Sequence, residues 1–67
     1  MRFELKEEYI ELYKLFKLLE LVDSGAEAKL IIADGHVKRN GEVELRKRAK
    51  IRRGDVIEVA DVVVEVV

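Results

Sequence analysis

The chain has 67 residues, with 13 basic and 14 acidic side chains and a formal net charge of −1. A domain of this size buries only about 60% of the surface that its unfolded chain exposes, which leaves little room for a large enzyme cleft. Cysteine is absent, which excludes disulfides and thiolate-bound zinc. No stretch approaches the roughly 18 apolar residues of a membrane span. We therefore expect a single domain over residues 1–67, located in the cytoplasm and without a membrane partner.

The composition gives one hint about origin. Glutamine, threonine and cysteine are absent, asparagine occurs once, and glutamate, lysine, arginine and valine are abundant. This balance is reported for proteins from hot environments. A designed or reconstructed sequence would have a similar composition.

Residues 1–6 are expected to form a short strand or an extended arm, because polar and apolar residues alternate there. Phe3 and Leu5 would face inward. From about Glu7 to Leu21, apolar residues recur at helical spacing and predict a first helix. Its apolar face is wide enough that some side chains would be exposed or would contact a second subunit. That face comprises Tyr9, Ile10, Leu12, Tyr13, Leu15, Phe16, Leu18, Leu19, Leu21 and Val22.

A second helix is predicted from about Gly25 to Asp34. Ser24 followed three residues later by Glu27 is a capping box. Gly35 can adopt the positive φ angle that commonly ends a helix. The two helices, over residues 7–35, should pack together as a hairpin or an angled pair.

After the second helix the apolar period changes to two on either side of Asn40–Gly41, which predicts a β-hairpin. A two-residue loop would pair Lys38 with Val43 and mix apolar and polar faces. A three-residue loop would pair Val37 with Leu45. We favour the longer loop, because apolar partners then share one face.

Turns at Gly54–Asp55 and Ala60–Asp61 should delimit two further strands, Val56–Val59 and Val62–Val67, both rich in β-branched residues. The last strand is expected to lie against the strand before it and under the N-terminal arm. Residues 36–67 would therefore form a small antiparallel β-sheet. The predicted fold class is α+β, with a two-helix unit packed on this sheet.

The charges are unevenly distributed along the chain. Residues 1–35, 36–54 and 55–67 carry net charges of −3, +6 and −4. Six of the cations fall within eight residues, interrupted only by Ala49 and Ile51. Such segregation indicates a polyanionic partner, nucleic acid foremost, although a solvated charged loop is the alternative. The six cations are Arg46, Lys47, Arg48, Lys50, Arg52 and Arg53.

Several short elements carry a family resemblance. They are the single residues Leu21, Ser24, Ala28 and Ile32, the segments Gly35–Val37 and Asn40–Gly41 and, after the basic linker, Gly54–Ile57. Over roughly residues 9–59 the chain resembles the S4 RNA-binding domain. Glu8–Ile10, Ser24–Gly25, Ala28–Lys29 and Arg46–Arg48 with Lys50 are similar to the short stand-alone bacterial S4-like proteins.

The resemblance implies a protein that docks on structured RNA, such as ribosomal or transfer RNA, through a basic loop and the second helix. Two family contacts are missing, since Gly25 and Glu11 stand where S4 domains commonly have arginine, and Arg39 replaces an aliphatic residue expected before Asn40. We therefore expect the contact surface to be shifted toward residues 46–53. Arg39 is expected either to contact phosphate or to cover the core at the sheet edge. The candidate RNA-binding residues are Lys29, Lys38, Arg39, Arg46, Lys47, Arg48, Lys50, Arg52 and Arg53.

All four aromatic residues precede residue 20 in the sequence. No stacking platform is therefore expected among the basic residues, which favours structured over single-stranded RNA. Helical spacing predicts core or dimer packing for the aromatics.

No catalytic constellation can be assembled from the sequence. His36 is the only histidine, Ser24 is explained by helix capping, and no glycine-rich nucleotide loop is present. We expect no enzyme activity, metal, cofactor or small-molecule substrate. The alternative function is a protein-interaction or self-assembly module that uses the apolar face of the first helix. A homodimer is left open.

Overall fold

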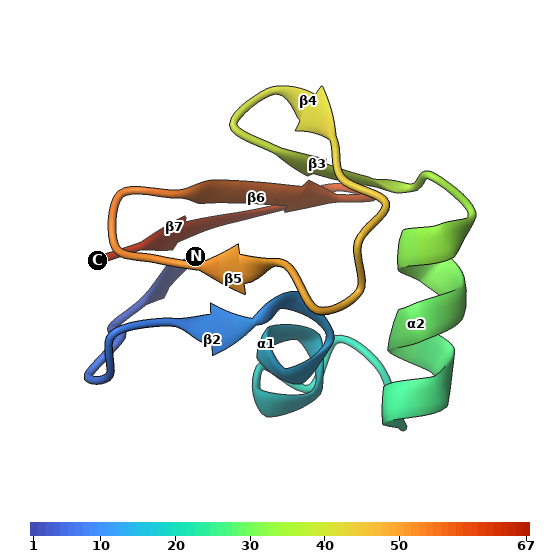
Figure 1. The fold of residues 1–67 in the computed structure, drawn as a ribbon, viewed down its shortest axis with the longest axis horizontal. Coiled ribbons are helices and arrows are strands. Elements are labelled where there is room, and N and C mark those ends of the chain that lie inside the picture. The colour runs from blue at the N-terminus through green and yellow to red at the C-terminus, as the bar shows by residue number, and fades with distance from the viewer.

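The computed structural model describes all 67 residues. Figure 1 shows a larger sheet above a two-stranded ribbon, with α1 below the ribbon and α2 at the right. Neither helix has the length and apolar character needed to cross a membrane. In chain order the elements are β1 (Arg2–Phe3), β2 (Ile10–Glu11), α1 (Leu12–Leu18), α2 (Gly25–Ala33), β3 (Val37–Arg39), β4 (Glu42–Val43), β5 (Lys50–Ile51), β6 (Val56–Val59) and β7 (Val62–Val66).

The larger sheet has five strands in the order β1-β7-β6-β3-β4. Its neighbours are antiparallel except at one edge, where β1 runs parallel to β7 and pairs Phe3 with Val66. The α+β class is confirmed, and β7 lies between β6 and the N-terminal arm as predicted. The sheet is mixed rather than wholly antiparallel. Parallel strands need a long connection between them. The chain between β1 and β7 provides this connection, because it includes both helices.

The first helix is shorter than predicted, since α1 spans Leu12–Leu18 rather than about Glu7–Leu21. The N–H groups of its first two residues donate to carbonyl groups of the 47–49 segment, at 3.0 Å each. Immediately before them, β2 pairs with β5. At the other end Glu20 has a positive φ of 58°, which is incompatible with a continuing helix. The apolar residues before α1 continue its helical spacing. Their segment nevertheless pairs with the distant residues 47–51 and does not form a helix.

Helix α2 begins at the predicted residue and ends within one residue of the predicted end. The Ser24 hydroxyl accepts a hydrogen bond from the Glu27 N–H at 3.2 Å. The Glu27 carboxylate accepts from the Asp23 N–H at 2.8 Å, one residue earlier than in a standard capping box. Gly35 follows with a φ of 81°. The capping prediction is confirmed.

The β3–β4 hairpin has a two-residue loop, so the predicted three-residue loop is wrong. Lys38 pairs with Val43, and the Glu44 N–H donates to the Val37 carbonyl at 2.9 Å. Both residues of the Asn40–Gly41 turn have positive φ, 53° and 86°. This is the backbone of a type I′ turn, which matches the twist of the flanking strands.

The wrong register came from the assumption that apolar residues of the second strand face the core. Val43 and Leu45 are in fact exposed, whereas Glu44 is only 8% exposed and is buried on the core side. A buried carboxylate is stable only when it is paired, and two arginines supply the pairs. The ion pairs therefore fix a register that apolar patterning alone would reject.

Twelve buried apolar residues form one core beneath both helices and the sheet. Two of them, Ala49 and Ile51, interrupt the basic run and are 5% and 0% exposed. The run is therefore anchored to the core rather than free in solvent. The twelve residues are Leu5, Leu12, Leu15, Phe16, Ala28, Ile32, Val37, Ala49, Ile51, Ile57, Val64 and Val66.

Candidate nucleic-acid interface

The basic run includes a strand, β5, and is not the simple linker that the sequence predicts. β5 lies antiparallel to β2, with Lys50 opposite Glu11 and Ile51 opposite Ile10. Successive side chains of a strand point to opposite faces. The buried Ala49 and Ile51 therefore alternate with exposed cations at 48, 50 and 52. The apolar residues hold the segment in place, and the cations form a row on its outer face.

A depression of about 430 Å³ opens on this face. Its lining is almost wholly cationic, and a concavity lined by one sign of charge concentrates the potential and attracts counter-ions. This geometry suits an anionic group of a larger ligand. The lining residues are Arg39, Arg46, Arg48, Ala49, Lys50 and Arg52.

Five cations on or beside this face have weak or no ion pairs. Lys29, Lys47 and Lys50 make no salt bridge within 4.0 Å, the limit for such a pair. Arg48 and Arg52 lie 3.9 and 3.6 Å from the carboxylates of Glu11 and Glu8. Exposed pairs at such distances contribute little free energy. These five side chains can therefore turn to phosphate oxygens at low cost.

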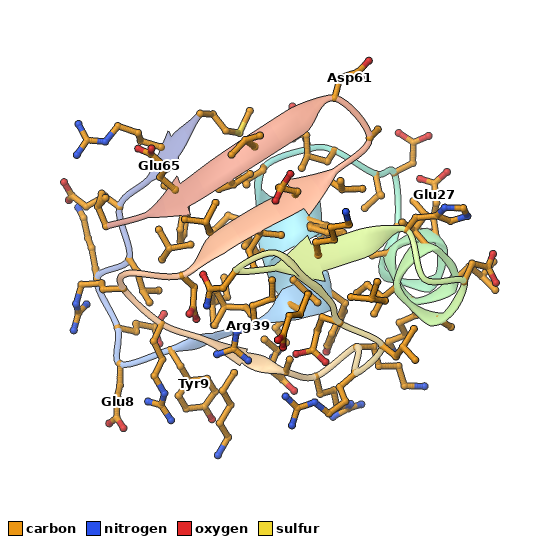
Figure 2. All side chains as sticks on the ribbon, turned by 90° about the horizontal axis from the view of Figure 1, so that it is seen from above. Glu8, Tyr9, Glu27, Arg39, Asp61 and Glu65 are labelled. Atoms are coloured by element: carbon orange, nitrogen blue, oxygen red, sulfur yellow. The ribbon has the colours of Figure 1, made fainter.

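Arg39 is engaged inside the protein. Its Nη2 donates to the Lys50 carbonyl at 2.9 Å and to the Asp55 carboxylate at 3.0 Å. Its Nη1 lies 3.6 Å from Glu44, and the side chain is only 23% exposed. Figure 2 shows Arg39 directed from β3 toward β5. The guanidinium thus ties β5 and the turn before β6 to β3.

Two more arginines of the predicted set also bind within the chain. The Nε and Nη2 atoms of Arg46 donate to the two carboxylate oxygens of Glu44, at 3.0 and 3.1 Å. Arg53 Nη1 donates to the carbonyl oxygens of Leu5 and Glu7, at 2.7 and 2.9 Å. Arg46 thereby neutralises a buried carboxylate, and Arg53 fastens the N-terminal arm.

The two predicted lysines outside the basic run are placed differently. Lys29 on α2 lies with its Nζ 4.8 Å from the centre of the Tyr13 ring, and the Arg48 guanidinium lies 5.8 Å from the same ring. Tyr13 therefore brings Lys29 to the basic face. Lys38 borders a separate hollow with Gly35, His36, Glu58 and Ala60. Lys38 is not brought to the cationic depression.

The expectation that no aromatic residue lies among the cations is wrong. Lys50 and Arg52 lie 5.1 and 5.8 Å from the centre of the Tyr9 ring. Tyr13 has Lys14, Lys29 and Arg48 within 5.9 Å of its ring centre. No local sequence pattern indicates this arrangement, because the antiparallel β2–β5 pairing, which was not predicted, brings the tyrosines beside the basic run.

Comparison with known proteins gives the family. A model of the S4 domain matches residues 3–67. The chain belongs to the S4 domain family. The proteins named "Putative RNA-binding protein YbcJ" in Escherichia coli K12 and "Uncharacterized protein YbcJ" in Shigella flexneri are each 47% identical over 62 residues, which cover 92% of this chain and 89% of the relative.

Two solved structures resemble this S4 domain. The solution structure of YbcJ from E. coli, described as revealing an αL motif involved in RNA binding, matches with a TM-score of 0.75 and 46% identity over 98% of this chain and 85% of that one. The 30S ribosomal protein S4e of Thermoplasma acidophilum has a TM-score of 0.66 and 33% identity. That match covers 81% of this chain and 29% of S4e, so the likeness is to one part of a longer protein.

The residues at the two missing arginine positions of the S4 pattern lie beside Tyr13 and Lys14. A Cβ atom at Gly25 would lie 3.7 Å from the Tyr13 ring, which is an ordinary contact distance, so a small side chain would also fit at the start of α2. Glu11 pairs with Lys14 at 3.0 Å and lies 3.9 Å from Arg48. The hydrogen bond that the Lys14 ammonium donates to the Glu11 carboxylate raises the pKa of Lys14. Glu11 therefore stabilises the charged form of Lys14, whereas Gly25 only lies beside the Tyr13 ring.

The carboxylates that hold the arginines in this S4 domain have lowered pKa values. Hydrogen bonding from Arg46 holds the pKa of Glu44 below its ordinary value of 4.5. Burial alone would raise the pKa of Asp55. Hydrogen bonds from the Arg52 N–H, Asn40 and Arg39 outweigh burial and hold that pKa below 3.8. Both groups are therefore more acidic in the folded chain than in the unfolded chain.

We expect acid to destabilise the domain through these two carboxylates. A carboxylate with a lowered folded pKa stabilises the fold above its unfolded pKa, and this contribution is lost as the pH falls through the folded value. The free energy of unfolding should therefore decrease below about pH 4.5. Thermal melting followed by circular dichroism between pH 2 and 7 measures this. The melting temperature of the Glu44→Gln variant should fall less steeply with decreasing pH than that of the wild type. An equally steep fall in both proteins would contradict the stabilising role assigned to the Glu44 carboxylate.

Proposed function

We propose that this chain is an RNA-binding module that docks on structured RNA through the outer face of β5 and the loop before it, extended by Lys29 of α2. The observation that carries the proposal is the alternation in the basic run. Its apolar residues are buried and its cations form a row beside a cationic depression. Guanidinium and ammonium groups in such a row bind successive phosphates of a nucleic-acid backbone.

The family relatives support RNA as the polyanion. The E. coli relative is named as an RNA-binding protein, and its structure is described with an RNA-binding motif. A further structural relative is a protein of the ribosome. We therefore propose a folded RNA as the ligand, ribosomal or transfer RNA, and the cytoplasm as the place of action. Binding rather than catalysis is the proposed activity.

The proposed residues divide into two groups by their contacts. One group holds the scaffold, because its guanidinium groups already bind carboxylates or carbonyls: Arg39, Arg46 and Arg53. Lys38 is peripheral, since it borders a different hollow. The other group has weakly engaged or unpaired cations and supplies the phosphate contacts: Lys29, Lys47, Arg48, Lys50 and Arg52.

The alternative function, a module that uses the apolar face of the first helix, has less support. Leu12, Leu15 and Phe16 are fully buried in this chain's own core, and only Leu18 of α1 is a strongly exposed apolar residue. One exposed leucine is ordinary for a small domain. Self-association stays a prediction.

A salt-titrated binding assay tests the proposed function. Four to six neutralised phosphates would give a slope of about −3 to −5 in a plot of log affinity against log salt concentration. We expect this slope with ribosomal RNA fragments and transfer RNA, together with weaker binding to an unstructured RNA of equal length. Equal and weak binding to every RNA would contradict docking on folded RNA.

A further inference from the structure

We propose that the Tyr9 ring, with Lys50 and Arg52, forms a platform on which one unpaired base of the bound RNA stacks. This inference rests on the proposed RNA binding. It adds a specific element to that function, because phosphate contacts alone do not distinguish paired from unpaired nucleotides. The position of the ring, its exposure and the charges around it all suit such a platform.

The position of the ring follows from the β2–β5 register. Ile10 pairs with Ile51 and Glu11 pairs with Lys50. Extending this antiparallel register by one residue places Tyr9 opposite Arg52. The buried Ile51 and the partly buried Ile10 pack on the core side of the ribbon and keep both strands in place. Lys50 is therefore held by backbone pairing, and Tyr9 and Arg52 are each adjacent to a residue that is held in this way.

The exposure of the ring favours a ligand over core packing. Tyr9 is 39% exposed, although a tyrosine ring has a large apolar area that would normally be covered. Figure 2 shows the Tyr9 ring projecting away from the ribbon, beside side chains that end in nitrogen. Tyr13 differs, because it is half-buried and packs against Gly25 and Lys29. Tyr9 is thus the aromatic available to a base.

The charges around the ring suit a nucleotide. Lys50 and Arg52 lie within 5.8 Å of the ring centre and are exposed. A base stacked on the ring would bring its flanking phosphate near these two cations. Cation–π contacts at exposed sites are weak, so both cations can move from the ring to the phosphate. Stacking on an aromatic ring contributes more and tolerates any base.

The carboxylates beside Tyr9 determine which part of the nucleotide the ring accepts. Glu7 and Glu8 border a depression of about 340 Å³ next to the ring. Glu8 lies 3.6 Å from Arg52 and is highly exposed. Their negative charge disfavours a phosphate over this depression, whereas a neutral base is not repelled. The phosphate is therefore directed to the side of Lys50.

Two matched RNA hairpins test the platform, one with a single bulged 2-aminopurine and one fully paired. We expect the wild-type protein to bind the bulged hairpin at least about five-fold tighter, since stacking on an aromatic ring is lost in the paired RNA. The 2-aminopurine fluorescence should be quenched on binding. Tyr9→Leu should lose both the preference and the quenching, and Tyr9→Phe should keep both. Leu18→Ala, which removes another exposed apolar side chain, should keep both as well.

The outcomes separate this inference from the proposed function. Equal affinity of the wild-type protein for the two hairpins, with a steep salt slope, would overturn the platform and leave RNA binding intact. An unchanged preference in Tyr9→Leu would also overturn the platform. Binding of neither hairpin would overturn both proposals. Because Tyr9 is exposed, we expect the melting temperature of Tyr9→Leu to stay within a few degrees of the wild type.

Discussion

Reversing the charge of Lys47 and Lys50 together is expected to weaken RNA binding by about 100-fold or more. Hydrogen bonds to charged groups contribute about 1.5–3 kcal/mol each, so the loss of two phosphate contacts costs about 3 kcal/mol or more. Each new glutamate also repels the RNA backbone. The slope of log affinity against log salt should become less steep by about two. Fluorescence anisotropy with a labelled RNA fragment at several salt concentrations measures both quantities.

The matched control for Lys47→Glu with Lys50→Glu is Arg2→Glu with Lys6→Glu. Both double variants change the net charge from −1 to −5, because each substitution replaces one positive with one negative charge. Arg2 and Lys6 lie on the N-terminal arm, exposed and in weak pairs at 3.8 and 4.0 Å. An equal loss of affinity in both double variants would show that net charge, rather than the face of β5, controls binding.

Replacing Arg39 with methionine is expected to destabilise the fold by about 2–3 kcal/mol, because its removal leaves the carboxylates of Glu44 and Asp55 without that partner. The remaining partners of both carboxylates limit the loss. For a domain of this size the melting temperature should fall by roughly 10–20 °C. The same variant, assayed at a temperature where it is folded, should keep the wild-type salt slope of RNA binding.

Lys38→Met is the control for Arg39→Met. Lys38 is the preceding residue of β3, is exposed and makes no salt bridge. Its replacement should change stability by less than about 0.5 kcal/mol. Urea unfolding of both variants compares them directly. A stable Arg39→Met protein with strongly reduced RNA affinity would instead make Arg39 a phosphate ligand.

Elements whose ends are specified by residues close together in the chain could be predicted from the sequence. Helix α2 is an example, since Ser24, Glu27 and Gly35 specify both of its ends within a few residues. The Asn40–Gly41 turn was also correctly placed. Strands β6 and β7 follow from β-branched runs between turns. In each case the residues that determine the structure are neighbours in the chain.

Features that depend on distant partners could not be predicted. The hairpin register depends on Glu44, whose burial makes sense only once Arg39 and Arg46 are seen to bind it. The start of α1 depends on the pairing of β2 with β5, a segment about 40 residues away in the chain. This separation is greater than any local sequence pattern spans. The same pairing moves Tyr9 from an expected core position to the basic face. The basic run itself was visible in the sequence, but its division into scaffold and weakly engaged cations was not.

The alternation of buried and exposed residues along β5 means that the proposed RNA-binding face is preorganised. Ala49 and Ile51 are held in the core, and the Arg39 guanidinium fixes the Lys50 carbonyl. Ordering a flexible segment normally reduces affinity, because its conformational entropy is lost on association. Much of that loss has already occurred here during folding. The outward residues can therefore be exchanged to retune the ligand while the inward residues keep the strand in place.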